Sequence, residues 1–133
     1  MREVDISKAC NAVLRGAVRK VLRVEYDFTV HGGAIGTIAL SGHIPAHATV
    51  VKIVTVERTT AIAGSGTIQF KAGTTALTGA LAVSDFTGVD FQTLAADGVK
   101  VAVVSQINFV IASDVITAGK LDIFIEFLEG NPA

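Results

Sequence analysis

The chain has 133 residues, of which 50% are apolar and 17% are charged, and its formal net charge is −1. This length corresponds to one domain with a buried core, and no apolar run approaches the roughly 18 residues of a membrane span. The single cysteine, Cys10, excludes a disulfide within the chain. The mean hydropathy of +0.57 therefore predicts that apolar surface is buried where subunits meet.

The charge of the chain divides near residue 23. Residues 1–23 carry six basic and two acidic side chains, a balance of +4, and residues 24–133 carry five basic and ten acidic ones, a balance of −5. We therefore expect a basic N-terminal arm, residues 1–23, followed by a body, residues 24–133. The charges spread along the first residues are unlike a signal peptide, so we expect synthesis in the cytoplasm.

A short helix is one expectation for the arm. Within residues 5–22, Leu14, Val18 and Leu22 follow one another at four-residue intervals, and Cys10 extends this row. The spacing is typical of one helical face, and Asp5 or Ser7 would cap its start. Gly16 lowers helix stability by about 1 kcal/mol relative to alanine. The alternative is an arm that becomes ordered only on a partner.

Alternating strands are expected from residue 24 onward. The first covers residues 24–30, with Val24, Tyr26, Phe28 and Val30 on one face. The glycines that follow His31 predict a turn.

A short strand, a long strand and a hairpin are expected next. Residues 34–40 form a short strand, and residues 41–47 form a loop that contains a proline. Residues 49–59 form the longest strand, which is apolar on both faces. Gly64-Ser65-Gly66 predicts a hairpin turn, and residues 67–71 form its return strand.

In the second half of the body, the sequence predicts further strands at residues 76–81, 86–91, 99–103, 107–111 and 120–128, and a turn at residues 114–119. The last strand has one wholly apolar face, which consists of Leu121, Ile123, Ile125 and Phe127. Its other face is only partly exposed to water and consists of Asp122, Phe124, Glu126 and Leu128. Eight or so short strands with frequent turns predict an all-β domain, a β-sandwich or jelly roll.

Catalytic and metal-binding patterns are scarce. His43 and His47 have the spacing of a helical metal pair, but Pro45 between them forbids that helix. We expect solvated loop histidines and no metal site. The glycine-rich segments 31–36 and 118–120 lack the order of a phosphate-binding loop.

The acidic residues and serines also follow no known catalytic or metal-binding motif. The carboxylates of Asp85, Asp90 and Asp97 do not follow the spacing of a calcium loop, and no Gly-x-Ser-x-Gly motif occurs. We expect no cofactor and no enzymatic activity. Nucleic-acid binding is not expected either, because the arm has no aromatic residue for base stacking and the body is acidic. Docking of the arm on an acidic protein surface fits its charge equally well.

Three stretches of the body together resemble a known class of protein. They are residues 28–40, which precede a proline-containing loop and Ala48-Thr49-Val50-Val51, then residues 64–68, and finally residues 116–127. This pattern of strands and turns resembles small structural proteins of tailed bacteriophages that are encoded near the major capsid gene, some of them capsid decoration (cement) or head-fibre proteins. The resemblance covers about residues 24–128.

The resemblance implies a β-sandwich or jelly roll, usually a trimer, on the capsid surface of a virion. Its partner would be the major capsid protein, and synthesis would take place in the host cytoplasm. We expect the anchor to pair with acidic groups of that protein through Arg15, Arg19, Lys20 and Arg23. We expect core or trimer contacts from Ile107, Phe109, Phe124 and Leu128.

A second hypothesis is a phage fibre or tail component, or a module that binds carbohydrate or the host. Loops in the region 72–98 would then hold the glycan. It ranks lower because surface aromatics usually serve that task, and this chain has only Tyr26 and seven phenylalanines, most of them on strand faces.

Overall fold

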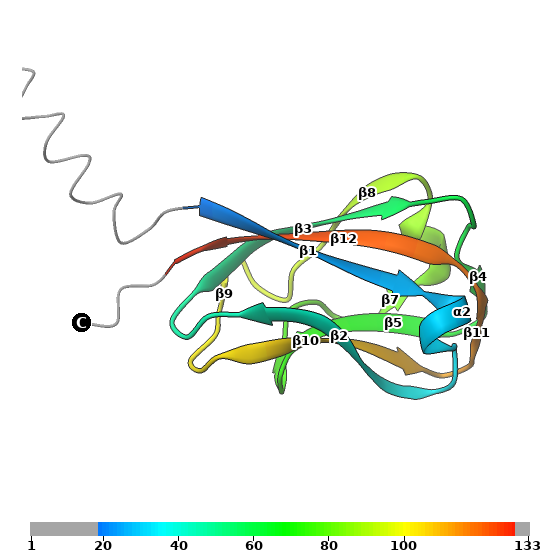
Figure 1. Cartoon of the computed structure of the whole chain (residues 1–133), viewed down its shortest axis with the longest axis horizontal. Coiled ribbons are helices and arrows are strands. Elements are labelled where there is room, and N and C mark those ends of the chain that lie inside the picture. The colour runs from blue at the N-terminus through cyan, green and yellow to red at the C-terminus, as the bar shows by residue number, and fades with distance from the viewer. Residues whose placement is uncertain (1–18, 130–133) are drawn as a thin grey trace, which may run out of the picture.

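The computed structural model describes residues 19–129, which form a sandwich of two antiparallel sheets (Figure 1). Sheet A contains β1 (Arg19–Asp27), β12 (Lys120–Leu128), β3 (Thr49–Glu57), β8 (Val89–Gln92) and β9 (Val99–Lys100). Sheet B contains β2 (Gly36–Ile44), β10 (Ser105–Ala112), β5 (Thr67–Ala72), β6 (Thr75–Ala76) and β7 (Leu81–Ala82). The predicted all-β sandwich is confirmed.

Three smaller elements join the sheets at their ends. A two-stranded ribbon consists of β4 (Ala63–Gly64) and β11 (Ile116–Ala118). The helical elements are α2 (Phe28–His31), of one turn, and the 3-10 helix η1 (Val83–Phe86). Neither helix in the described part of the chain has the length and apolar character needed to cross a membrane.

The strand order is that of a jelly roll. Successive pairs lie one inside the other along the sequence: β1 with β12, β2 with β10, and β3 with β8. The innermost strand, β5, pairs with β6 and β7. Sheet A therefore runs β1-β12-β3-β8 and sheet B runs β2-β10-β5-β6. Such an order arises when one long antiparallel hairpin rolls up into two facing sheets.

Strand β12 lies between β1 and β3 and confirms the predicted alternation. Its bounds are those expected, and Leu121, Ile123, Ile125 and Phe127 are buried against sheet B. Asp122, which was expected on the partly wet face, is buried as well, because the side chains of Arg23 and Arg58 lie over it.

Aromatic rings connect the two sheets through the core. Tyr26 of β1 stacks on Phe109 of β10, with ring centroids 4.1 Å apart. Phe109 meets Phe70 edge-on at 5.6 Å, and Phe70 meets Phe86 edge-on at 6.1 Å. Ile107 lies on the same inner face of β10 and is fully buried. Two of the four residues expected in core or trimer contacts, Ile107 and Phe109, thus belong to the core of one chain.

Strand β1 begins earlier than the sequence predicted. Residues 19–23 were assigned to the arm, and residues 19–22 to its helix, but Arg19–Asp27 is one continuous strand whose residues all pair with β12. The side chains of this segment alternate as in a strand: Leu22 and Val24 point inward, and Arg23 points outward. The rest of the predicted helix, with Asp5, Ser7, Cys10 and Leu14, lies outside the described residues.

The first predicted strand also ends early, at Asp27. The Asp27 carboxylate accepts the backbone N–H of Thr29 at 2.9 Å and so caps the turn α2. Val30, expected on a strand face, is instead on this turn and 75% exposed. The Tyr26 hydroxyl donates to the carbonyl of Gly32 at 2.5 Å and holds the turn against the sandwich.

The predicted hairpin at residues 64–66 is wrong, because β3 and β5 belong to different sheets. Gly64 has φ 131° and pairs with β11 instead. A side chain at Gly66 would collide with the backbone carbonyl of Asp114. These glycines allow the chain to cross between sheets against the 114–116 segment.

Other boundaries shift for similar reasons. Strand β2 continues through Ile44 across most of the predicted 41–47 loop, so His43 lies on a strand. Gly42 permits this, since a side chain there would collide with Val24 of β1. Strand β11 forms inside the predicted 114–119 turn, and the predicted 99–103 strand shortens to β9.

We expect Phe109→Ala to lower the free energy of unfolding by about 3–5 kcal/mol, because it removes the ring that stacks on Tyr26 and leaves a cavity. Urea denaturation followed by circular dichroism measures this. Val103→Ala is the matched control, since Val103 is exposed, and it should change stability by less than about 0.5 kcal/mol. Equal effects of the two substitutions would contradict the assigned core.

Candidate functional site: the charged outer face of sheet A

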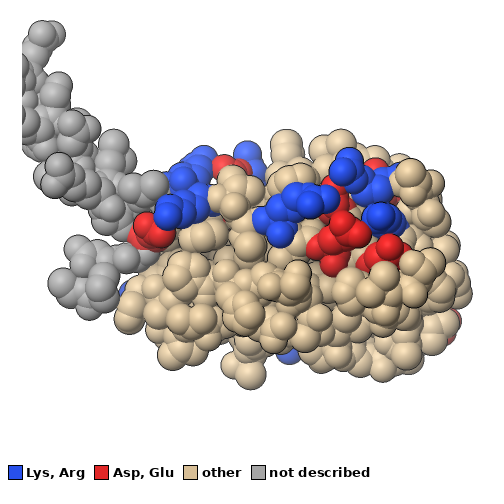
Figure 2. Space-filling model, viewed as in Figure 1, with Lys and Arg blue, Asp and Glu red and all other residues tan. Residues whose placement is uncertain are grey.

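Charged side chains gather on one side of the molecule. Residues 19–129 contain eight lysines and arginines, and six of them form ion pairs with acids of β1, of β12 or of the residue that follows β12. Figure 2 shows these blue and red groups together over sheet A, above a surface that is largely uncharged. We call this surface the outer face of sheet A.

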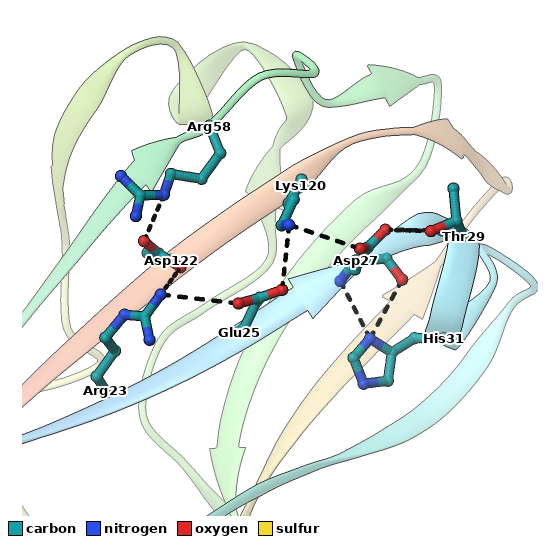
Figure 3. Close-up of polar contacts among 8 residues, drawn as sticks. All are labelled: Arg23, Glu25, Asp27, Thr29, His31, Arg58, Lys120 and Asp122. Atoms are coloured by element: carbon teal, nitrogen blue, oxygen red, sulfur yellow. Dashed lines mark hydrogen bonds and ion pairs between the residues drawn. The ribbon is translucent and has the colours of Figure 1, made fainter.

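A buried carboxylate organises the outer face. Asp122 of β12 is almost inaccessible to solvent, and Arg23 of β1 donates from Nη2 to its Oδ1 at 2.8 Å. Arg58, which follows β3, lies with Nε 2.6 Å from Oδ2 (Figure 3). A carboxylate without water requires such partners. Asp122 is therefore buried although it points outward, because two arginines cover it.

Weaker ion pairs extend from this centre. Arg23 also approaches Glu25, at 3.7 Å, and Lys120 lies between Glu25, at 3.6 Å, and Asp27, at 3.9 Å (Figure 3). On the other side, Glu126 lies 3.7 Å from Lys52. Pairs of this length on a surface contribute little to stability, so these side chains remain available to a partner.

The cations lie outermost and several of the acids lie beneath them. The side chains of Arg23 and Arg58 are 51% and 50% exposed, whereas that of Asp122 is 2% exposed. Lys52 is likewise far more exposed than Glu126. The part of the face around Asp122 and Glu126 therefore presents positive charge to an approaching molecule. Four cations surround these two acids: Arg19, Arg23, Lys52 and Arg58.

Three of the four predicted anchor residues lie on this face or at its edge. Arg19 pairs with Glu126 at 3.6 Å, Lys20 pairs with Glu129 at 2.9 Å, and Arg23 pairs with Asp122. They belong to β1 and not to an arm. Arg15 lies outside the described residues. Their role as an anchor stays a prediction.

An apolar strip that the sequence did not predict crosses the same face. Phe124 of β12 pairs with Val54 of β3, which pairs with Phe91 of β8, and Val56 pairs with Val89 in the next row. We call these five residues the apolar strip. Phe91 and Val89 are 72% and 64% exposed. The signal in the sequence was the strand at 49–59 with apolar residues on both faces.

One contact connects the strip to the charges, and one strip residue belongs to a predicted contact set. The ammonium group of Lys52 lies 5.0 Å from the centre of the Phe91 ring, within the range of a cation–π contact. Phe124 and Leu128, both expected in core or trimer contacts, are half-buried on β12. Phe124 thus differs from Ile107 and Phe109 in being reachable from outside.

The end of the sandwich near α2 carries a second polar group of residues. The Asp27 N–H donates to His31 Nδ1 at 3.0 Å, and the His31 ring stacks on Tyr26 at 5.7 Å. Burial, with the nearby charge of Asp27, raises the pKa of Tyr26 to about 12. The hydroxyl and N–H of Thr29, followed by Lys120 and His31, lower the pKa of Asp27. These bonds hold the turn.

Two hollows and two further histidines lie at other places in the described residues. Two hollows of about 310 and 470 Å³ open near this end and share Thr59 and Lys120. Within residues 19–129, no three His, Cys, Asp or Glu side chains come close enough to hold a metal ion. His43 is exposed on β2, and His47 occupies a turn with φ 66°.

No family model matches the chain, and no curated protein matches it. A solved structure does share the fold: a chain of the acidic stable capsid structure of Helicobacter pylori bacteriophage KHP30. The similarity covers 87% of this chain and 91% of that chain, with a TM-score of 0.50 and 12% sequence identity. At this identity the likeness concerns the fold.

Tyr26 should titrate near pH 12 in the folded protein, and ultraviolet absorbance of the phenolate measures it, because the chain has one tyrosine and no tryptophan. In the unfolded chain the phenol ionises near pH 10. Its contribution to stability is therefore complete below about pH 10 and is lost as the pH rises towards 12. The control is the same titration in denaturant, and a folded midpoint near 10 would contradict the burial.

Asp122→Asn should lower the free energy of unfolding by about 1–3 kcal/mol, because two charge-assisted contacts weaken while the half-exposed arginines can turn to water. Chemical denaturation measures this. Glu129→Gln breaks a more exposed pair with Lys20 and should cost less than about 1 kcal/mol. If the two variants lost equal stability, Asp122 would not be the centre of the face.

Proposed function

We propose that this chain is a virion structural protein of a tailed bacteriophage, a decoration (cement) protein that binds the outside of the capsid shell. It acts as a homo-oligomer, a trimer, its partner is the major capsid protein, and it carries out no catalysis. The observation that carries the proposal is the fold that 87% of this chain shares with a chain of a phage capsid structure. The sequence at residues 28–40, 64–68 and 116–127 resembles that of small structural proteins of tailed bacteriophages.

A protein of this kind needs broad contact surfaces and no reaction centre. It stabilises a shell by binding the assembled state and not its separate parts, so that mass action favours assembly. The outer face of sheet A supplies exposed cations next to exposed apolar side chains. Such a face suits contact with a larger protein surface.

The opposite face of the sandwich supports the homo-oligomer. Among the described residues, the outward positions of β2, β10 and β5 carry a single charged side chain, Lys71. Their amides are bonded within the chain, since Gln69, Gln106 and Asn108 donate to backbone carbonyls. A largely uncharged face whose side-chain amides donate hydrogen bonds within the chain is suited to contact between copies.

Purified protein should pellet with undecorated, expanded capsids of its own virus and saturate at a fixed number of copies per shell, a multiple of three at each local symmetry site. Sedimentation of the capsids with quantified bands measures this. The free protein should sediment at about three times the 13.8 kDa of one chain. An unrelated phage capsid serves as the control surface.

Failure to pellet with correctly expanded capsids would overturn the decoration role. It would favour the alternative, a fibre or tail component that binds carbohydrate or the host. One observation supports that alternative: Phe91, in the region 72–98, is an exposed aromatic residue, and such rings serve as platforms for sugars. Saturable binding of a glycan that Phe91→Ser abolishes would establish it.

A further inference from the structure

The apolar strip is an exposed surface that lacks a partner in the described residues. Its members are cross-strand neighbours on β12, β3 and β8, so that they form one continuous patch. Phe91 and Val89 are among the most exposed large apolar side chains of residues 19–129. Contiguous apolar surface of this kind is typical of an interaction site.

The border of the strip identifies the chemistry of its partner. Arg23, Arg58 and Lys52 stand around it, each about half exposed, while Asp122 and Glu126 lie beneath them. Two copies meeting strip to strip would bring these cations together, and like charges across an interface are unfavourable. A second copy of this chain is therefore a poor occupant of the strip.

We propose that the outer face of sheet A docks on a protein surface made of apolar side chains bordered by Asp and Glu. Phe91 enters the apolar part, and the three cations meet the carboxylates. This inference rests on the proposed function, under which the capsid shell bears that surface. It places the contact on strands β3, β8 and β12, with Arg23 of β1 and Arg58 at its border. Of the four anchor residues predicted from the sequence, this contact uses Arg23.

A protein surface fits this face better than a nucleic acid does. Single-stranded nucleic acid is held by several aromatic rings along a positive groove, and the strip offers one strongly exposed ring, Phe91. The acids beneath the cations, above all Asp122, also weaken the field that phosphates would meet. An apolar centre with a charged border is the usual anatomy of a protein interface.

The test compares two serine substitutions at similarly exposed residues, Phe91→Ser on the strip and Val30→Ser on the turn α2, which are 72% and 75% exposed in the native protein. Full-length protein is titrated onto undecorated capsids and pelleted. Phe91→Ser should raise the concentration for half-saturation at least about tenfold, as loss of a central interface residue does. Val30→Ser should leave it unchanged. Thermal unfolding of both variants verifies that they fold.

Each other outcome overturns the inference. If wild-type protein pellets and Phe91→Ser pellets equally well, the docking surface is wrong while the decoration role stands. If wild-type protein does not pellet, the proposed function fails and the inference fails with it. If Phe91→Ser lowers the mass of the free oligomer in velocity sedimentation, the strip holds a second copy. Equal weakening by Val30→Ser would show that the effect is not specific to the strip.

Discussion

The outer face of sheet A depends on the ion pairs that the buried carboxylate of Asp122 makes with Arg23 and Arg58. This carboxylate lies on the central strand β12 and uses both oxygens, one for Arg23 from β1 and one for Arg58 beyond β3. Because a carboxylate out of water requires charged or hydrogen-bonding partners, the two arginines are held across the sheet with their outer surfaces exposed. The acid thereby fixes three neighbouring strands to one another and places positive charge at the surface.

The two faces of the jelly roll have different chemistry as a result. Sheet A presents cations beside the apolar strip, and sheet B presents amides, hydroxyls and small apolar groups with Lys71 as its one charge in the described strands. A subunit that meets a shell on one side and its own copies on another needs this kind of asymmetry. The rigid aromatic core, with Tyr26 stacked on Phe109, keeps the two faces in a fixed relation.

The sequence predicted the strands better than their partners. Alternation identified β12 to the residue because every inward position is apolar, and this signal is local. The partner of β3 was missed because the pairing of strands distant in sequence depends on how the two sheets pack, which Gly66 against Asp114 helps to determine. The cations of the outer face of sheet A were predicted in part. Arg19, Lys20 and Arg23 were predicted as an anchor, but they were placed in an arm and not in a strand. The apolar strip could not be predicted, since a strand apolar on both faces looks the same whether it is covered by its own chain or by a partner.

The central claim is that the outer face of sheet A faces the shell and sheet B faces other copies. A reconstruction of decorated capsids by electron cryo-microscopy, at a resolution that separates strands, tests it most directly. We expect density for the sandwich on the outside of the shell, with β3, β8 and β12 towards the capsid surface and β2, β10 and β5 towards neighbouring copies. Sheet B against the shell, or decorated capsids without density for this sandwich, would contradict the account.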